Sequence, residues 1–360
     1  MLVEPSPWEG CRVFLTGHTG FKGSWLSIWL AQLGAKVTGY ALPAEERSLF
    51  RQAGVADIVR HVEGDVRDEA ALDAAVADFD PEVVFHLAAQ PIVRLSYEEP
   101  RETWATNVQG TVNLLDACRR APSLRAIVAV TSDKCYENRE WVSPYRETDP
   151  MGGHDPYSAS KGAAELAIAS YRSSFLSSEG GPLLASVRAG NVIGGGDWAR
   201  DRLIPDIVRA LIAGERVRIR SPHAVRPWQH VLEALGGYLL IAQRLLEGDR
   251  NAASAWNFGP SVDDTRTVGW VAQRMVGEWG SGGIDIDDAS RPHEATMLSL
   301  DCAKARHLLG WRPALDVAGA IERIVSWHKN IESGADPMDC CREQLKEYRA
   351  RMETALLEQQ

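Results

Sequence analysis

A turn with regularly spaced glycines near the N-terminus constrains the fold more than any other feature of the sequence. Residues 12–16 form a short apolar run, residues 16–23 read Thr-Gly-His-Thr-Gly-Phe-Lys-Gly, and residues 21–33 continue with a helical, largely apolar pattern. Three glycines at this spacing permit a tight turn, a close approach of backbone to a pyrophosphate, and close packing of helix on strand. Because the N–H groups and dipole at a helix N-terminus favour anions, the segment predicts a dinucleotide-binding turn between a strand and a helix.

The rest of the first half alternates strands with helices. Apolar runs of strand length occupy residues 36–40, 81–87 and 124–131, and helical patterns occupy residues 69–79 and 100–120. Alternation of this kind predicts βαβ units and a parallel sheet covered by helices on both faces. We expect an α/β fold, a Rossmann-type doubly wound parallel sheet with a smaller, mixed α/β substrate-binding lobe on its C-terminal side.

The composition of the chain changes after the first 190 residues. Residues 191–201 are rich in glycine and aspartate, which is typical of a loop, and short β-rich runs then alternate with amphipathic helices. We expect residues 1–190 to form an NAD-binding domain to which residues 225–256 return. We expect residues 191–335 to form mainly a substrate-binding lobe, and residues 336–360 to form a helical tail.

Composition excludes several classes of protein. Hydrophobic residues make up 45% of the 360 residues and charged residues 24%, as in ordinary globular proteins, and no apolar run approaches the roughly 20 residues of a membrane span. A net charge of −10 disfavours nonspecific binding to nucleic acid. The first ten residues lack the apolar core of a signal peptide, and the six cysteines include no CxxC pair. We therefore expect a cytoplasmic protein with reduced thiols, no metal site, and neither membrane nor nucleic-acid partners.

A tyrosine and a lysine four residues apart form the second strong motif. Asp155 and Pro156 are typical of the cap and first position of a helix, so Tyr157 and Lys161 should lie on one helical face. An ammonium group beside a phenol favours phenolate and lowers its pKa from the reference value of about 10. The pair therefore predicts a tyrosine that acts as a base near neutral pH.

Polar residues follow the apolar run that ends at residue 131. Ser132, Asp133 and Lys134 come next, and at the carboxyl end of a parallel strand they should face the same crevice as Tyr157. Asp133 and Lys134 form a potential acid/base couple. The competing interpretation is a turn that carries a surface ion pair.

Two further strand ends should meet the glycine turn. A carboxylate at residue 65 could accept a hydrogen bond from an adenine amino group, and small residues at 88 and 89 would let a cofactor lie against backbone. The second strand ends without an acidic residue for the ribose 2′-hydroxyl, and Arg47 could suit a 2′-phosphate, so NADP stays open beside NAD. The residues that we expect to bind the cofactor are Gly17, His18, Thr19, Gly20, Phe21, Lys22, Gly23, Asp65, Val66, Leu87, Ala88, Ala89, Gln90, Thr106, Tyr157 and Lys161.

Over nearly its whole length the chain resembles the nucleotide-sugar 4,6-dehydratases, a group within the extended branch of the short-chain dehydrogenase/reductase superfamily. Members acting on dTDP-glucose usually carry Thr-Asp-Glu where this chain has Ser-Asp-Lys at 132–134, and the lysine resembles the branch that acts on CDP-glucose. The segments that carry the resemblance are 17–25 (GHTGFKGSW), 131–138 (TSDKCYEN), 194–206 (GGGDWARDRLIPD), 226–233 (RPWQHVLE) and 300–311 (LDCAKARHLLGW).

The resemblance implies an internal hydride cycle through NAD that turns CDP-glucose into CDP-4-keto-6-deoxyglucose, a precursor for deoxysugars such as those of lipopolysaccharide O-antigen. It implies that Tyr157 takes the proton of the 4-hydroxyl, Lys161 holds the nicotinamide ribose, and Ser132 binds the 4-oxygen. Asp133 would protonate the departing 6-hydroxide. Lys134 would serve at C5 either as a neutral base or as a charged stabiliser, and the sequence leaves both roles open.

The resemblance also suggests which residues hold the substrate. Forked arginine donors suit phosphate oxygens, and tryptophan suits a base. The resemblance favours a homodimer or higher homo-oligomer built through the helices at 100–120 and 155–178. The alternatives are a sugar-nucleotide 4-epimerase, a dehydratase of another nucleotide hexose, and a binding scaffold without turnover; the acid/base couple after residue 131 favours dehydration. The candidate substrate-binding residues are Asn191, Arg202, Leu203, Arg226, Trp228 and Arg291.

Overall fold

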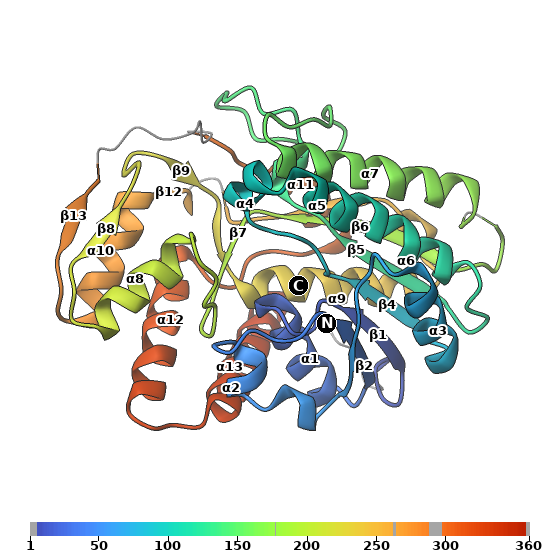
Figure 1. Ribbon diagram of the computed structural model, residues 1–360, viewed down its shortest axis with the longest axis horizontal. Helices are drawn as coiled ribbons and strands as arrows, with labels where there is room; N and C mark the ends of the chain where they lie inside the picture. The colour runs from blue at the N-terminus through green and yellow to red at the C-terminus, as the bar shows by residue number, and fades with distance from the viewer. Residues whose placement is uncertain (1–5, 177, 262–263, 288–296, 358–360) are drawn as a thin grey trace.

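A seven-stranded parallel sheet forms the centre of the protein in this computed structural model, which describes residues 6–176, 178–261, 264–287 and 297–357 (Figure 1). The strand order is β11-β6-β5-β4-β1-β2-β3, and every pair is parallel. The predicted Rossmann-type doubly wound fold is therefore confirmed. The strands are β1 (Arg12–Thr16), β2 (Lys36–Ala41), β3 (Arg60–Glu63), β4 (Val83–His86), β5 (Ala126–Val130), β6 (Leu183–Ala189) and β11 (Ala255–Phe258).

The direction of winding reverses at β1. From β1 the chain moves outward through β2 and β3, then returns to the other side of β1 and continues through β4, β5 and β6. Ligands of open α/β sheets bind outside the carboxyl ends of the strands at such a reversal. The topology therefore places the ligand crevice beside the ends of β1 and β4.

Helices cover both faces of the sheet. One buried cluster beneath α1 (Phe21–Gln32) and α9 (Val231–Leu246) continues into the second lobe, and a smaller one lies beneath α3 (Glu69–Phe79), α6 (Gly110–Cys118) and α7 (Pro156–Ser174) (Figure 1). The helix α9 packs on β5 and β6, and β11 pairs with β6 at the sheet edge. The segment after residue 230 is thus part of the layers around the central sheet.

A second lobe occupies the left of Figure 1, on the side where the parallel strands end. Its described residues form three helices and three two-stranded ladders, of which one is antiparallel and two are parallel. Its elements are α8 (Leu203–Ile212), α10 (Val268–Trp279), α12 (Val317–Glu332), β7 (Asn191–Ile193) with β10 (Trp228–His230), β9 (Val225–Arg226) with β12 (Arg266–Thr267), and β8 (Val217–Ile219) with β13 (Ile284–Ile286).

The long helix expected over residues 100–120 is interrupted. A π-helical turn, η2 (Ala105–Gln109), separates α5 (Pro100–Trp104) from α6. Within this turn the buried side chain of Asn107 is hydrogen-bonded to the backbone of Gln90, outside the helix. None of the helices that the structure describes is long and apolar enough to cross a membrane. The remaining short elements are α2 (Leu49–Gln52), η1 (Val55–Asp57), α4 (Val93–Glu98), η3 (Asp133–Cys135), η4 (Arg250–Ala252) and α11 (Ala303–Leu309).

The C-terminal helix α13 (Pro337–Leu357) is docked on the outside of α1. The buried Tyr348 ring meets Trp29 edge-on at 5.8 Å, and its hydroxyl donates to Glu233 Oε2 at 2.9 Å. The other oxygen of Glu233 accepts the backbone N–H groups of Ala314 and Leu315. One buried carboxylate thus ties α9, α13 and the segment before α12 together.

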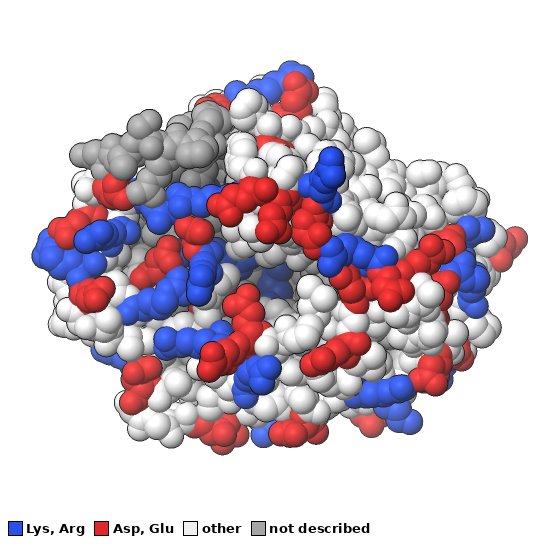
Figure 2. All heavy atoms as spheres, in the orientation of Figure 1, with Lys and Arg blue, Asp and Glu red and all other residues white. Residues whose placement is uncertain are grey.

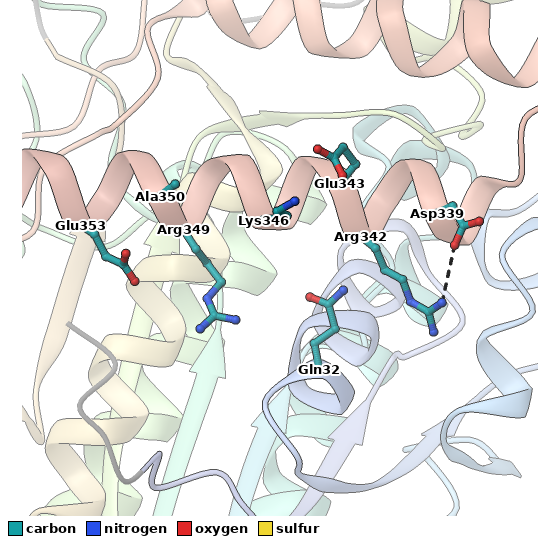
Figure 3. A pocket seen from close by; sticks show the side chains of 8 residues that line it. All are labelled: Gln32, Asp339, Arg342, Glu343, Lys346, Arg349, Ala350 and Glu353. Atoms are coloured by element: carbon teal, nitrogen blue, oxygen red, sulfur yellow. Dashed lines mark ion pairs between the residues drawn. The ribbon is translucent and has the colours of Figure 1, made fainter.

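The opposite face of α13 is polar. Figure 3 shows charged side chains of this helix beside the end of α1, where Asp339 pairs with Arg342. Charged residues on an exposed helix face contribute little to stability. The attachment of α13 therefore depends on its buried face.

We expect Tyr348→Ala to lower the free energy of unfolding by about 3–5 kcal/mol, because a buried aromatic ring and its hydrogen bond are lost. Urea denaturation followed by circular dichroism measures the change. Lys346→Ala, on the exposed face of the same helix, should change it by less than about 0.5 kcal/mol. Equal effects of the two substitutions would contradict this account of how α13 is attached.

Candidate active site

Two of the three glycines in the turn are required by close backbone contacts. Gly17 has φ = +76°, and a Cβ atom there would lie 2.7 Å from the backbone nitrogen of Ala88. A Cβ atom on Gly23 would lie 2.1 Å from the carbonyl oxygen of Gly17. Gly20 differs, because it caps α1 in an extended conformation and its Cβ would come no closer than 3.4 Å.

The turn is braced from the neighbouring strand end. Thr16 Oγ1 accepts the backbone N–H groups of Leu87 and Ala88 at 3.2 Å, and lies 2.8 Å from Nδ1 of His86. Ala88 and Ala89 are partly exposed, and the backbone N–H of the next residue, Gln90, donates to Oδ1 of Asn107. The ends of β1 and β4 therefore form one rigid floor.

This floor fits a dinucleotide. The first turn of α1 contains no acidic residue, and no side chain caps its N-terminus, so its N–H groups are left for an anion. A side chain at position 17 would collide with the backbone of Ala88, and one at position 23 would collide with the carbonyl of Gly17. Gly17 to Gly23 would hold the pyrophosphate of NAD, as the sequence predicts for this segment.

The side where the adenosine would lie contains contacts that the sequence did not indicate. Nε2 of the buried His18 lies 2.6 Å from Nδ1 of His61, and burial lowers the pKa of His18 to about 4. His18 packs against Gly39, where a Cβ atom would lie 2.2 Å from its ring. Asp65 accepts from Nε of Arg67 through both oxygens, and this hydrogen bond lowers its pKa.

Three of the predicted cofactor residues also make contacts within the protein. Val66 packs against α6, and its carbonyl accepts from Asn113. The hydroxyl of Thr19 donates to the carbonyl of Leu42 just after β2. Thr106 lies half-buried in the π-helical turn η2. Their contact with a cofactor stays a prediction.

Arg47 is already engaged by the second lobe. Its guanidinium lies 3.6 Å from the centre of the Trp198 ring, and the indole N–H of Trp198 donates to Gln52 at 2.8 Å. The rings of Trp198 and of His328 on α12 also meet at 5.0 Å in a T-shaped arrangement. The arginine that the sequence offered for a 2′-phosphate is therefore stacked on a tryptophan.

Tyr157 and Lys161 lie side by side at the N-terminal end of α7, as predicted, with 7% and 5% of their surfaces exposed. The side chain of Asp155 caps the helix by accepting from Ser158. Burial raises the pKa of Tyr157 to about 12, against the lowering effect of a hydrogen bond with Ser132. Burial lowers the pKa of Lys161 to about 8. Desolvation therefore outweighs the predicted lowering of the Tyr157 pKa.

Asp133 and Lys134 begin the short helix η3 after the end of β5, and Ser132 directly precedes it. The Ser132 hydroxyl caps this helix and donates to Oδ1 of Asp133 at 3.0 Å. Asp133 is 3% exposed, burial raises its pKa, and no hydrogen bond to its Oδ2 comes from the residues that the structure describes. Lys134 is half-buried beside it. The structure thus brings a carboxyl group whose pKa is raised by burial into the crevice of Tyr157.

Lys22 extends from the glycine turn into the same crevice. Burial lowers its pKa to about 7, the positive charges of Lys161 and Arg202 act in the same direction, and Asp133 acts in the opposite direction. Its ammonium lies 6.0 Å from the ring centre of Tyr238. Lys22, which the sequence predicts only as a cofactor-binding residue, therefore also interacts electrostatically with Lys161 and Asp133.

The described candidate substrate residues divide into three sets, and Arg291 lies outside the described residues. Arg202 pairs with the buried Asp197 at 3.2 Å. The charge of the buried Arg226 acts on Asp133 and partly opposes the effect of burial, which raises the pKa of Asp133. Trp228 is only 3% exposed, and its indole N–H donates to the carbonyl of Arg266, so it lies inside the lobe. Leu203 begins α8 and Asn191 begins β7, and both are partly exposed.

The surface around the crevice carries many charges. Figure 2 shows a hollow near the middle of this face, with Lys or Arg at its floor and more of both at its left. Arginines of α8, β8 and the preceding loop lie on that side, interspersed with aspartates. Although the protein is acidic overall, its surface beside this hollow carries exposed cations as well as aspartates.

Comparison with known proteins agrees with this geometry. A family model described as GDP-mannose 4,6 dehydratase matches residues 14–324. A CDP-glucose 4,6-dehydratase of Salmonella typhimurium is 50% identical over 353 residues, which cover 96% of this chain and 98% of that protein.

The chain belongs to the nucleotide-sugar 4,6-dehydratase family. Solved structures agree in fold: a dTDP-glucose 4,6-dehydratase of Streptomyces venezuelae, with NAD bound, is 24% identical with a TM-score of 0.77 and covers 91% of this chain and 99% of that one. A UDP-glucose 4-epimerase of Thermotoga maritima is 21% identical with a TM-score of 0.74, covering 89% and 99%. The resemblance read from the sequence is confirmed.

One residue of the site in this member of the dehydratase family was missed by sequence reasoning. Asn107 accepts from the backbone N–H of Gln90 and donates to the Gln90 carbonyl and to Ser160 Oγ at 2.9 Å. It thereby joins the end of β4 to α7 between Tyr157 and Lys161. The available signal was a helix-disfavouring asparagine in the middle of an apolar helical pattern.

We expect Gly23→Ala to abolish binding of NAD by this member of the dehydratase family, because the new methyl group must displace the Gly17 carbonyl. Gly20→Ala is the matched control and should retain most of the affinity, since its methyl group meets only one atom at 3.4 Å. Fluorescence titration with NAD measures both, and circular dichroism verifies folding. Equal affinities of the two variants would refute this role of Gly23.

Proposed function

We propose that the protein converts CDP-glucose to CDP-4-keto-6-deoxyglucose by an internal redox cycle that uses NAD. The observation that carries the proposal is the carboxyl of Asp133, which is buried in the crevice of Tyr157, where burial raises its pKa. Elimination of water needs such an acid to protonate the departing 6-hydroxide. The likeness to a CDP-glucose 4,6-dehydratase at 50% identity supports the choice of sugar nucleotide.

Tyr157, Ser132 and Lys161 serve the oxidation at C4. Bound NAD supplies the hydride acceptor for C4, the donor for C6, and a positive charge that favours phenolate. Tyr157 takes the proton of the 4-hydroxyl, and Ser132, which is hydrogen-bonded with it, holds the 4-oxygen. Lys161 holds the cofactor ribose and adds its positive charge beside the phenol.

Asp133 and Lys134 serve the elimination that follows. The ketone at C4 acidifies the C5 hydrogen, and Lys134 lies next to Asp133 in η3 to act there, as a base or as a charge that stabilises the enolate. Asp133 gives its proton to the 6-oxygen as the C6–O bond breaks. Ser132 donates to Oδ1 of Asp133, which leaves Oδ2 for the acidic proton.

A 4-epimerase is the second candidate, because the epimerase of Thermotoga maritima shares the fold. Epimerisation loses no water, so it needs no acid for a departing hydroxide. The buried Asp133 would then have no chemical task, and a buried carboxyl without one is costly to keep. This argument favours dehydration.

Incubation with CDP-, dTDP-, GDP- and UDP-glucose tests the proposal directly. We expect a 4-keto product, detected by its absorbance in alkali, from CDP-glucose and much less from the other three. Formation of the corresponding galactose nucleotide without a keto product would establish the epimerase. A keto product from a different nucleotide would support dehydration and overturn the choice of cytidine.

We expect Asp133→Asn to separate oxidation from elimination. The amide cannot protonate the 6-hydroxide, so the variant should accumulate enzyme-bound NADH while product formation falls by about 10²–10⁴-fold. Stopped-flow absorbance of NADH and product analysis measure the two steps. Tyr157→Phe is the matched control, and should form little NADH because it blocks the earlier step. Near-native turnover of Asp133→Asn would refute the role of Asp133.

We expect Trp198→Leu to bring NADP binding closer to NAD binding. Removal of the ring frees Arg47, whose guanidinium could then reach a 2′-phosphate. The ratio of the dissociation constants for NADP and NAD should fall by about tenfold or more, and Trp198→Leu with Arg47→Ala should restore it. An unchanged ratio would show that the stacked arginine has no part in cofactor choice.

Exposed apolar side chains support assembly as a homodimer. Tyr97 on α4, Trp104 on α5 and Leu166 on α7 are 45%, 41% and 63% exposed, and these helices pack together on one side of the sheet. Large exposed apolar side chains on neighbouring helices are typical of a protein interface.

All six cysteines are free thiols, which supports a reducing cytoplasm.

A further inference from the structure

A buried ion pair joins the catalytic helix to the sheet. Glu165 on α7 and Arg188 on β6 are each 4% exposed at the side chain, and the guanidinium donates twice, from Nε to Oε1 at 2.9 Å and from Nη2 to Oε2 at 2.8 Å. Thr131 donates to the first carboxylate oxygen and Ser186 to the second. All four donors and the carboxylate lie inside the protein.

The same arginine reaches the segment that follows η3. Its Nη1 donates to the hydroxyl of Tyr136 at 2.7 Å, and that hydroxyl donates to Oδ1 of Asn257 on β11 at 2.7 Å. Arg188 Nη1 also donates to the carbonyl of Glu147. The pair therefore holds the chain on both sides of the short helix that carries Asp133.

The members of this network are neighbours of catalytic residues along the chain. Thr131 directly precedes Ser132, and Tyr136 follows the last residue of η3. Glu165 lies one helical turn beyond Lys161, on the face that Tyr157 and Lys161 share. The distance between the two catalytic segments is thus set by hydrogen bonds to one carboxylate and one guanidinium.

Glu165 also acts on the charge of Lys161. The titratable groups around Lys161 are Tyr157 and Glu165 from its own helix, Cys135 from η3, His86 from β4 and Lys22 from α1. Burial disfavours the ammonium, and the carboxylate of Glu165 opposes that effect. Glu165 itself stays ionised, because the hydrogen bonds and charge of Arg188 lower its pKa despite burial.

We propose that Glu165 and Arg188 are positioning residues for the reaction: together they hold α7 against the end of β5, and Glu165 keeps Lys161 charged while Tyr157 works. The inference rests on the proposed function for the identity of the reaction. Stability alone is a weak reason for such a pair, since apolar residues of similar volume often replace buried ion pairs without loss. The placement of every partner beside a catalytic residue favours the functional role.

The test compares Glu165→Gln with two other variants. Glu165→Gln keeps the shape and removes the charge, and Glu165→Leu with Arg188→Met removes both charges, so that no guanidinium is left buried and unpaired. Glu233→Gln is the matched control, because Glu233 is another buried carboxylate with three donors, which belong to α13 and the segment before α12. Urea denaturation establishes that each variant is folded.

Two measurements report on Lys161. The first is the pH dependence of NADH formation when substrate is mixed with the NAD-loaded enzyme. The rate should fall on the alkaline side as Lys161 loses its proton, and this fall should move to lower pH by about one unit in Glu165→Gln and by less in the double variant. The second is the pH dependence of acetic anhydride labelling of Lys161, read by mass spectrometry, which requires no turnover.

We expect both curves to shift in the Glu165 variants and to stay at the wild-type position in Glu233→Gln. Lower stability of the Glu165 variants with unshifted curves would overturn the inference and leave the pair a structural feature. If wild-type enzyme forms no NADH with any nucleotide sugar, the proposed function fails. The labelling curve still decides whether Glu165 keeps Lys161 charged.

Discussion

The site depends on the contact of bare backbone where β1, β4 and α1 meet. Gly23 lets the first turn of α1 rest on the carbonyl of Gly17, and Gly17 in turn rests on the backbone of Ala88. Nothing larger than hydrogen fits at either position. This packing aims the N-terminus of α1 across the ends of the central strands, and it brings the turn to the strand end that Asn107 joins to the catalytic helix.

Burial then acts in opposite senses on the acids and bases that line the crevice. It raises the pKa of Asp133 and Tyr157 and lowers that of Lys161, because in each case desolvation penalises the charged form. An acid that must give a proton late in the reaction benefits from this directly. The phenol and the amine need compensating charges, and the structure supplies one of them in Glu165.

The sequence was sufficient where function depends on local pattern. The glycine turn, the strands and the shared face of Tyr157 and Lys161 follow from spacing alone, and the structure has them where they were predicted. Contacts between distant segments were out of reach. Neither the stacking of Arg47 on Trp198 nor the pairing of Glu165 with Arg188 has a signature in the residues around either partner.

The π-helical turn at Ala105–Gln109 restricts where the chain can lose a residue. Such a turn holds one residue more than an α-helical turn, so α5 and α6 are out of phase with a continuous helix. Deleting any one residue of the turn would let the two helices merge and rotate one against the other by about 100°. Asn107 could then no longer reach both Gln90 and Ser160. Surface loops tolerate deletions, whereas this helical segment requires its exact number of residues.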